Sequence, residues 1–189
     1  MLSRHGNVSG FDHNRESVEH ALSRKICDVR IGGLSGGPSF PGESFDLVTL
    51  LDVLEHIDDD VAPLISLHDI LNPGGHIIIA VPALPILWSS HDIVHGHMRR
   101  YTAASLRAAV VAAGFEPVYL SYFNTIFLPL MALPRLYERI AGLPEDNYLK
   151  LPWGPVNTLM TWIFSLERHI IGRVSLPVGG SLIMAGRKK

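Results

Sequence analysis

The sequence predicts an α/β protein built on a doubly wound, mostly parallel sheet. Three observations support this prediction. Apolar strands alternate with helical segments along residues 7–120, the strands are nearly continuous apolar runs, and the loops between them are short. Strands that are apolar on both faces indicate a parallel sheet covered on both sides. Alternation of strand and helix is the pattern of right-handed crossovers between parallel strands.

The first elements are short. A strand at residues 7–11 ends before Asp12, and Asn14 is placed to cap a helix with one apolar face. Residues 26–34 form the next predicted strand. Glycines and prolines at residues 36–42 then predict a loop.

The clearest strand, residues 45–51, is almost wholly apolar and is expected at the centre of the sheet. The helix that follows has apolar residues in rough helical period over residues 61–71. We expect it to stop at residues 72–75, where proline and glycine cannot continue a helix. Another buried strand is predicted at residues 77–81.

The last elements of this pattern are an alanine-rich helix at residues 103–113, which Gly114 terminates, and a strand at residues 115–120. An α/β core is therefore predicted for residues 1–121. Residues 122–189 are expected to form a C-terminal apolar helical extension packed on the same domain.

Charge and cysteine content exclude several classes of function. The 16 basic residues are balanced by 18 acidic ones, so the chain lacks a broad positive field, and we expect no nucleic-acid partner. The single cysteine, Cys27, permits no intrachain disulfide and indicates a reducing, cytoplasmic compartment. Asn124, Pro129 and Pro134 interrupt the apolar residues 118–136, so any membrane association is expected to be peripheral. The sequence does not indicate an oligomeric state.

Four stretches occur in the order and spacing of a known family. Residues 45–57 read FDLVTLLDVLEHI, residues 71–82 read LNPGGHIIIAVP, residues 10–12 read GFD, and residues 91–101 read HDIVHGHMRRY. Together they closely resemble class I S-adenosylmethionine-dependent methyltransferases over residues 5–120. The resemblance implies a Rossmann-like sheet, S-adenosylmethionine as the cofactor, and methyl transfer as the reaction.

The resemblance implies cofactor-binding residues at the carboxyl ends of strands, where ligands of open α/β sheets bind. Asp12 matches the family's acidic residue that accepts hydrogen bonds from the ribose hydroxyls, or else it is only a strand-end or helix-cap residue. Leu51, Asp52 and His56 match the segment that lines the adenosine and methionine part, although His56 also fits a structural role. Relatives often bind the adenine amino group through an acidic residue; here a backbone group of Leu34 is expected to substitute.

The family's first strand and its glycine-rich turn do not appear before Gly6. Those glycines let the backbone approach the cofactor closely, so we expect a sheet lacking its first strand and a cofactor pocket lacking one wall. The pairs Gly32-Gly33 and Gly36-Gly37 follow a later strand and are loop glycines. The alternative to an enzyme is a non-catalytic methyltransferase-like binding protein, or a truncated fragment with no cofactor affinity.

The loop at residues 88–101 follows the strand that ends in Pro82, and in relatives it faces the acceptor. Methyl transfer requires that the acceptor be held against the methyl carbon and lose its proton. An imidazole can take a proton near neutral pH, so His91 or His97 is the candidate general base. Tyr101 is placed to hydrogen-bond to the acceptor.

Other side chains of this loop are candidates for acceptor binding, because an arginine fork binds anionic groups and a carboxylate can orient a histidine. The predicted acceptor-binding residues are Trp88, Asp92, Arg99 and Arg100. Alternatively, Arg99, Arg100 and Tyr101 pin the loop to a helix that begins near Thr102. The loop histidines lack the rigid i, i+4 spacing of helical zinc ligands, so no metal site is predicted.

The C-terminal segment exceeds what a minimal methyltransferase core needs, and we interpret it as a cover for the acceptor pocket. The helical spacing of Trp162, Leu166, His169 and Ile170 is typical of core packing. If exposed, these side chains would suit a lipid or isoprenoid acceptor at a membrane surface. The sequence therefore predicts a methyltransferase that acts on a small or lipid-like acceptor.

Overall fold

The structure is a computed structural model that describes residues 2–25, 27–34, 40, 42–141 and 154–189. Most of the predicted loop at residues 36–42, including Gly36 and Gly37, lies outside the described residues. The strands are β1 (Ser9–Asp12), β2 (Asp28–Ile31), β3 (Phe45–Leu51), β4 (Leu71–Pro82), β5 (Glu116–Phe123) and β6 (Ser181–Arg187). The helices are α1 (Arg15–Ser23), α2 (Val61–Ile70), α3 (Ser90–Val94), α4 (Ala103–Ala112), α5 (Leu128–Ala141) and α6 (Gly154–Glu167), with 3-10 turns η1 (Leu2–Arg4), η2 (Leu54–His56) and η3 (Pro85–Leu87).

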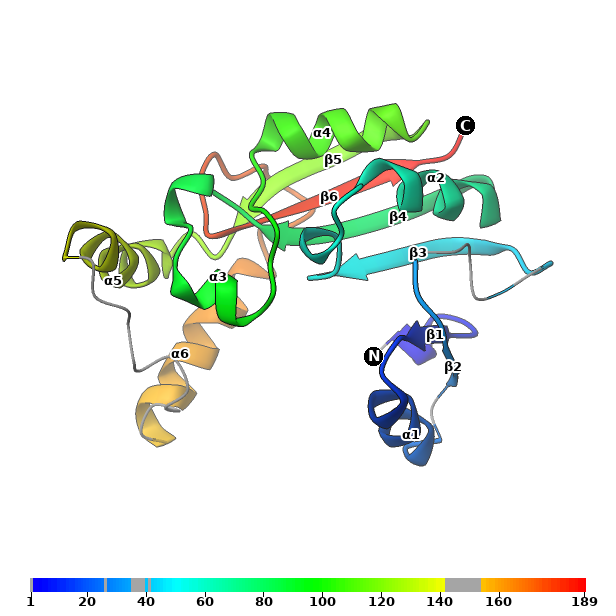
Figure 1. The fold of residues 1–189 in the computed structure, drawn as a ribbon, viewed down its shortest axis with the longest axis horizontal. Coiled ribbons are helices and arrows are strands. Elements are labelled where there is room, and N and C mark those ends of the chain that lie inside the picture. Colours follow the sequence, from blue (N-terminus) through cyan, green and yellow to red (C-terminus); the bar gives the residue numbers. More distant parts are fainter. Residues whose placement is uncertain (1, 26, 35–39, 41, 142–153) are drawn as a thin grey trace.

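These elements form two sheets (Figure 1). The larger sheet has the strand order β3-β4-β6-β5, in which β3 is parallel to β4 and β6 is antiparallel to both of its neighbours. The smaller sheet pairs β1 with β2 in parallel. Because β6 alone runs against the other strands of its sheet, the architecture confirms the predicted mostly parallel α/β class.

The β1–α1–β2 unit lies beyond β3, on the side away from β4 (Figure 1). Within the described ranges no strand joins the two sheets by hydrogen bonds. The buried Phe40 links them, because its ring lies 6.1 Å from Phe11 and 5.3 Å from Phe45 between centroids. At this open edge Leu47 and Leu51 of β3 are 42% and 55% exposed. Two separate sheets, with β3 at the edge of the larger one, are what we expect of a sheet without its first strand.

The hydrophobic core lies between the larger sheet and the helices α2 and α4, which contact each other on one face (Figure 1). Local signals start α1 and α4 as predicted. The Asn14 side chain accepts hydrogen bonds from the backbone of Glu16 and Ser17 at the start of α1. Thr102 caps α4 in the same way by accepting from the backbone N–H of Ser105.

Residues 72–75, with one proline and two glycines, end the helix as predicted, but they already belong to a strand, whereas the next strand was predicted to begin at residue 77. β4 begins at Leu71, directly after α2. The reason is pairing with a distant segment: the backbone N–H of Gly74 donates to Lys188 O over 3.0 Å, and the N–H of Lys188 donates to Gly75 O over 2.8 Å. Proline and glycine are tolerated at the first residues of a strand.

The C-terminal segment contains the helices α5 and α6, but its last residues complete the sheet. β6 lies between β4 and β5 and pairs with both along its length. The segment 122–189 is therefore only partly a helical extension, and the boundary at residue 121 does not separate it from the core. Leu182 and Met184 of β6 are fully buried.

Leu182→Ala is expected to lower the free energy of unfolding by about 2–5 kcal/mol, because a fully buried side chain is replaced by a cavity. Urea unfolding followed by circular dichroism measures the loss. Val178→Ala, at an exposed position before β6, is the control and should change stability by less than about 0.5 kcal/mol. Equal effects of the two substitutions would contradict the placement of β6 in the core.

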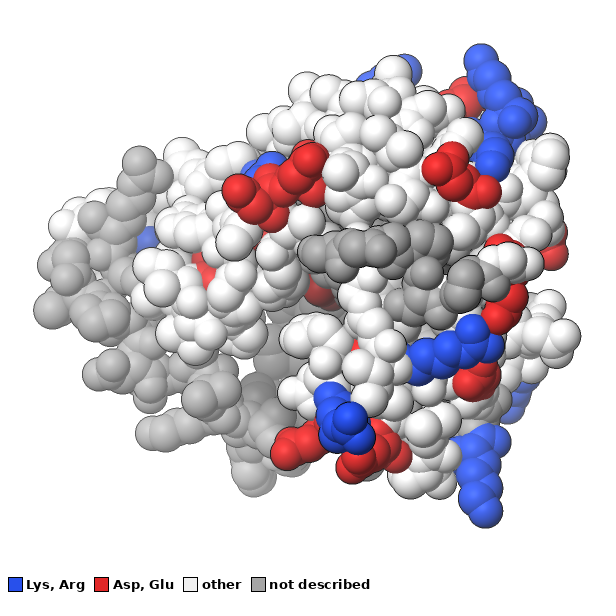
Figure 2. Space-filling model, turned by 45° about the vertical axis from the view of Figure 1, so that its right-hand side comes forward, with Lys and Arg blue, Asp and Glu red and all other residues white. Residues whose placement is uncertain are grey.

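The surface is mixed in charge. On the face shown in Figure 2, Lys and Arg side chains lie beside Asp and Glu side chains rather than forming one continuous basic area. None of the helices in the described ranges has both the length and the apolar content needed to cross a bilayer.

Candidate active site

Two segments meet at the carboxyl ends of β3 and β4. The first is η2, which follows β3, and the second is the loop at residues 83–101, which follows β4. The loop returns to its own strand, because the Tyr101 N–H donates to Pro82 O over 2.9 Å. It also contacts η2, since the Met98 N–H donates to Glu55 O over 2.8 Å. The fold thus brings residues 52–56 and 88–101 together.

Asp92 is the buried anchor of the loop. Its Oδ1 accepts hydrogen bonds from Arg100 Nε and His97 Nδ1, each over 2.8 Å, and its Oδ2 accepts from the backbone of Ser89 over 3.0 Å. Burial would raise the pKa of Asp92, but the hydrogen bonds from Arg100 and His97 outweigh burial and hold the pKa below its usual value. The carboxylate is therefore ionised and accepts from all three donors.

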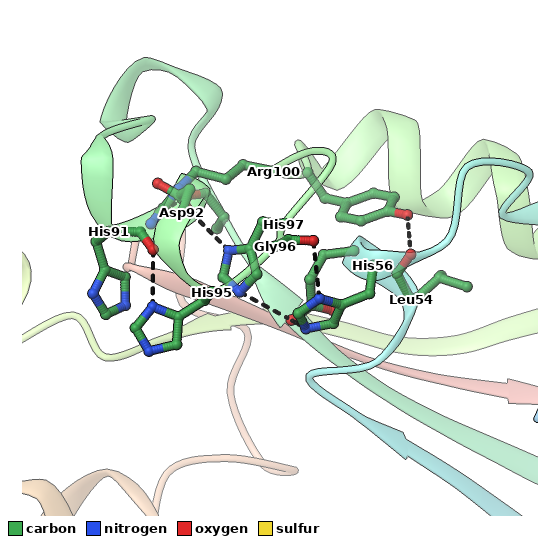
Figure 3. Close-up of polar contacts among 11 residues, drawn as sticks. Leu54, His56, His91, Asp92, His95, Gly96, His97 and Arg100 are labelled. Carbon is green, nitrogen blue, oxygen red and sulfur yellow. Dashed lines mark hydrogen bonds and ion pairs between the residues drawn. The ribbon is translucent and has the colours of Figure 1, made fainter. Parts of the chain in front are cut away.

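Asp92 fixes the orientation of His97. An ionised carboxylate can only accept, so Nδ1 of His97 donates to Asp92 and Nε2 is the ring nitrogen left for another partner. This Nε2 lies 4.0 Å from Oε1 of Glu55. Figure 3 shows the Asp92–His97 contact and the ring of His97 between Asp92 and His56.

Glu55 is a functional candidate that the sequence analysis missed. Its side chain is 0% exposed, and both carboxylate oxygens lack a hydrogen-bond partner among the described residues. Burial raises the pKa of Glu55 to about 7; its own backbone and the charge of Arg100 oppose the rise, whereas the charges of Asp52 and Asp92 add to it. The sequence signal that could have identified Glu55 is its position as an acidic residue beside His56, just after the most apolar strand.

His56 comes from the same turn as Glu55 and faces the loop. Its Nδ1 donates to the carbonyl of Gly96 over 3.2 Å, and its Nε2 lies 4.0 Å from Glu55 Oε1 (Figure 3). The rings of His56 and His97 have centroids 4.9 Å apart. Because the His56 side chain is 39% exposed, the cluster of Glu55, His56 and His97 opens to solvent on the His56 side.

Three residues of the loop that were predicted to contact the acceptor make contacts within the protein instead. Tyr101 is 1% exposed and its hydroxyl donates to Asp60 over 2.9 Å; burial, and then Asp60, raise its pKa far above the usual value. Arg100 is buried against Asp92 and Ala83 O. Arg99 contacts Asp58 and Asp60.

These contacts fit the alternative in which Arg99, Arg100 and Tyr101 pin the loop. Positioning roles are favoured over the predicted catalytic role of Tyr101 and the predicted acceptor contacts of Asp92 and Arg100, because all three side chains are buried and hydrogen-bonded within the chain. Trp88 is 36% exposed and remains a predicted acceptor contact.

His91 is the weaker of the two predicted bases. Burial, then the nearby His95 and Arg135, lower its pKa to about 4. Its ring stacks near His95 at 4.1 Å and lies 6.5 Å from His97. A group with so low a pKa holds a proton poorly at neutral pH, so of the two predicted bases we keep His97 as the candidate.

The predicted cofactor residues occupy the exposed ends of strands. Asp52 has a positive φ of 53°, a conformation uncommon outside glycine, and its backbone N–H donates to Ala80 O over 3.0 Å. Asp52 and Leu51 are both exposed, while Leu34 packs partly against the core. Asp12 is half-exposed and accepts from the Asn14 N–H over 2.8 Å.

This edge fits part of the predicted cofactor. An exposed carboxylate and exposed apolar side chains suit ribose hydroxyls and an adenine ring. Gly10 and Gly33, two glycines near this edge in sequence, lack the crowded surroundings of a close backbone approach. No hydrogen bond or ion pair within the described part of the chain joins Asp12 to residues 51–56.

Comparison with known proteins points to one family. Residues 3–120 match a family model described as "Methyltransferase domain". The chain is 30% identical over 112 residues to a "Probable S-adenosylmethionine-dependent methyltransferase" of Mycolicibacterium smegmatis, covering 58% of this chain and 43% of that protein. It is 30% identical over 86 residues to a "Ubiquinone biosynthesis O-methyltransferase" of Pseudomonas aeruginosa, covering 42% of this chain and 37% of that protein.

A solved structure shares the fold. The S-adenosylmethionine-dependent methyltransferase of Mesorhizobium loti superposes with a TM-score of 0.62 at 16% identity, over 98% of this chain and 82% of the other. The chain spans less than half the length of the two curated relatives.

Proposed function

Since the chain belongs to the class I S-adenosylmethionine-dependent methyltransferase family, we propose that it transfers a methyl group from S-adenosylmethionine to an oxygen of a small or lipid-like acceptor. The observation that carries this proposal is the contact of His97 Nδ1 with the buried Asp92, which leaves Nε2 of His97 near Glu55, in the turn that follows β3. The similarity to an O-methyltransferase supports an oxygen acceptor.

For methyl transfer the protein needs to place the acceptor against the methyl carbon and to remove one proton from it. S-adenosylmethionine supplies a methyl group on a positively charged sulfur, which leaves as a neutral thioether. The acceptor hydroxyl lies against the cluster of Glu55, His56 and His97 and loses its proton there. Nε2 of His97 offers the lone pair for that proton, and the charge of Asp92 stabilises the resulting imidazolium.

The cofactor residues proposed for this chain are those at the strand ends. Asp12 accepts hydrogen bonds from ribose hydroxyls, the exposed Leu51 and Asp52 lie against the adenosine and methionine part, and a backbone group of Leu34 binds the adenine amino group. The carboxyl edge of a parallel sheet is where such ligands bind. Trp88, exposed in the loop after β4, contacts the acceptor.

The helices α5 and α6 support a lipid-like acceptor. α5 contacts η3, directly before Trp88, and the stacked rings of Phe127 and Phe164, 4.8 Å apart, join α6 to the start of α5. Both helices expose apolar side chains, namely Leu130, Leu133, Leu136, Tyr137 and Ile140 of α5 and Val156, Leu159, Trp162, Phe164 and Leu166 of α6. The expected core packing of Trp162, Leu166 and Ile170 is thus corrected, since these side chains are exposed. An apolar surface of this kind suits an acceptor with a hydrocarbon tail and a peripheral membrane contact.

His97→Ala is expected to lower kcat for methyl transfer by about 10²–10⁴-fold, because the lone pair that takes part in proton removal is lost. The assay follows labelled methyl groups from S-adenosylmethionine to aromatic hydroxyl acceptors, with and without an apolar tail. His95→Ala, on the same loop and exposed, is the control and should keep the wild-type rate.

Two outcomes would overturn the proposal. Full activity of His97→Ala would remove His97 from the reaction. Failure of the unmodified chain to bind S-adenosylmethionine in calorimetry would favour the non-catalytic binding protein. This outcome is worth testing because β1 and β3 belong to separate sheets.

A further inference from the structure

We propose that Glu55, His56 and His97 form a binding site for one divalent transition-metal cation of the zinc class, with a fourth position open to the acceptor oxygen. The role of the cation in methyl transfer rests on the proposed function; its binding does not. The three residues come from η2 and from the loop after α3, segments that the fold brings together at the carboxyl end of the sheet (Figure 3).

The distances between the candidate ligand atoms fit a cation. The three donor atoms lie within 4.8 Å of one another, and Oε1 of Glu55 is 4.0 Å from Nε2 of both histidines. In a tetrahedral site with bonds of about 2.1 Å, neighbouring ligand atoms are about 3.4 Å apart. Closing the site would shorten each Glu55–histidine distance by about 0.6 Å and the distance between the two histidine nitrogens, which is at most 4.8 Å, by up to about 1.4 Å.

Each histidine is already oriented for metal binding. Nδ1 of His56 donates to Gly96 O, and Nδ1 of His97 donates to the carboxylate of Asp92. A histidine ligand usually gives its second ring proton to a carbonyl or carboxylate in this way, which fixes the tautomer and aims the lone pair. Nε2 of each histidine lies 4.0 Å from the same oxygen of Glu55.

Glu55 supplies an independent observation. A carboxylate that is fully buried with neither oxygen hydrogen-bonded is rare, because its desolvation is not compensated. A bound cation would compensate it directly. The half-exposed ring of His56 gives the cation a path to the site from solvent.

The donor set selects the class of cation. Two imidazoles and one carboxylate suit zinc, cobalt or iron, whereas magnesium and calcium prefer sites made of oxygen atoms. The sequence predicts no metal site among the loop histidines. In the structure both oxygens of Asp92 are taken by Arg100, His97 and Ser89, so Asp92 supports a ligand instead of being one.

A cation in this position changes the route of proton removal. The acceptor hydroxyl binds the open position, the cation lowers the pKa of the hydroxyl, and the O–H proton passes to water. The oxygen electron pair then forms the bond to the methyl carbon, while the S–CH3 bond breaks and its electron pair remains on sulfur. Nε2 of His97 is in that case a ligand and not the base.

The test uses the chain without a histidine tag, stripped with a chelator and titrated with Zn²⁺ by calorimetry and with Co²⁺ by visible absorption. We expect one cation per chain and a higher Tm with Zn²⁺. With Co²⁺ we expect a d–d absorption band typical of a four-coordinate site with nitrogen ligands. His56→Ala, at an exposed position that should not disturb folding, and Glu55→Gln are each expected to weaken binding at least about tenfold. Asp92→Asn is expected to weaken it by about 10–100-fold through His97.

His95→Ala is the matched control and should bind as the wild type does, because it removes a loop histidine outside the cluster. Equal losses for His95→Ala and His56→Ala, or unchanged Zn²⁺ affinity in both His56→Ala and Glu55→Gln, would overturn the site. Methyl transfer that continues in excess chelator would show that the cation takes no part in the reaction, and it would not affect the proposed function. Specific cation binding without any methyl transfer would support the metal site and contradict the proposed function.

Discussion

Asp92→Ala is expected to lower the free energy of unfolding by about 3–5 kcal/mol, because it breaks a buried ion pair. The guanidinium of Arg100 is 2% exposed and loses the carboxylate that neutralises it, so a buried charge is left without a partner. The loop also loses the acceptor for His97 and for the Ser89 N–H. Chemical denaturation at pH 7 measures the change.

Two further variants test that explanation. Asp69→Ala removes a carboxylate whose pairing with His68 is largely exposed, and should cost less than about 1 kcal/mol. Adding Arg100→Met to Asp92→Ala removes the stranded charge and should recover part of the loss. A double variant less stable than Asp92→Ala would show that packing, and not the unpaired charge, causes the effect.

Glu55→Gln is expected to stabilise the metal-free protein by about 3 kcal/mol at pH 8 and to leave it nearly unchanged at pH 4. Burial raises the pKa of Glu55 to about 7 in the folded chain, from 4.5 in the unfolded chain. Between these two values the folded chain binds more protons, so the stability of the wild type falls as pH rises through this window. An amide of the same shape does not ionise and escapes that loss.

The measurement is a series of urea unfolding curves from pH 4 to pH 8 in the presence of a chelator. The difference between variant and wild type should grow between pH 4.5 and pH 7 and then level off. Glu19→Gln, on the exposed side of α1, should show no such growth. A difference that stays constant across this range would mean that Glu55 titrates in the folded chain as it does in water.

Local sequence signals predicted most of the fold. The apolar run at β3 and the Asn14 and Thr102 caps act through neighbours in sequence, so they can be read without the structure. β6 could not be predicted in the same way, because its place between β4 and β5 depends on pairing with residues 71–82 and 116–123. The strand assignment of residues 72–75 depends on the same distant contact with Lys188.

The candidate site was predicted in its parts but not in its arrangement. His56, Asp92 and His97 were singled out because their side chains carry chemistry and follow strands. The burial of Glu55 depends on a loop that folds back from Met98, and the burial of Tyr101 depends on Asp60, so neither is visible in the local pattern. For the same reason the sequence grouped the loop histidines with each other, whereas the structure groups His97 with the turn after β3.

The antiparallel strand β6 has a consequence for the kinetics of folding. β4 and β5 share no ladder with each other and meet only through residues 181–187. Closing that ladder requires contacts between segments far apart in the chain, which makes the step slow. Until it closes, two strands present unsatisfied backbone groups along the edges that β6 later occupies, and such edges invite pairing with other chains. Refolding yield should therefore fall with protein concentration, although in the folded sheet these edges of β4 and β5 are paired with β6.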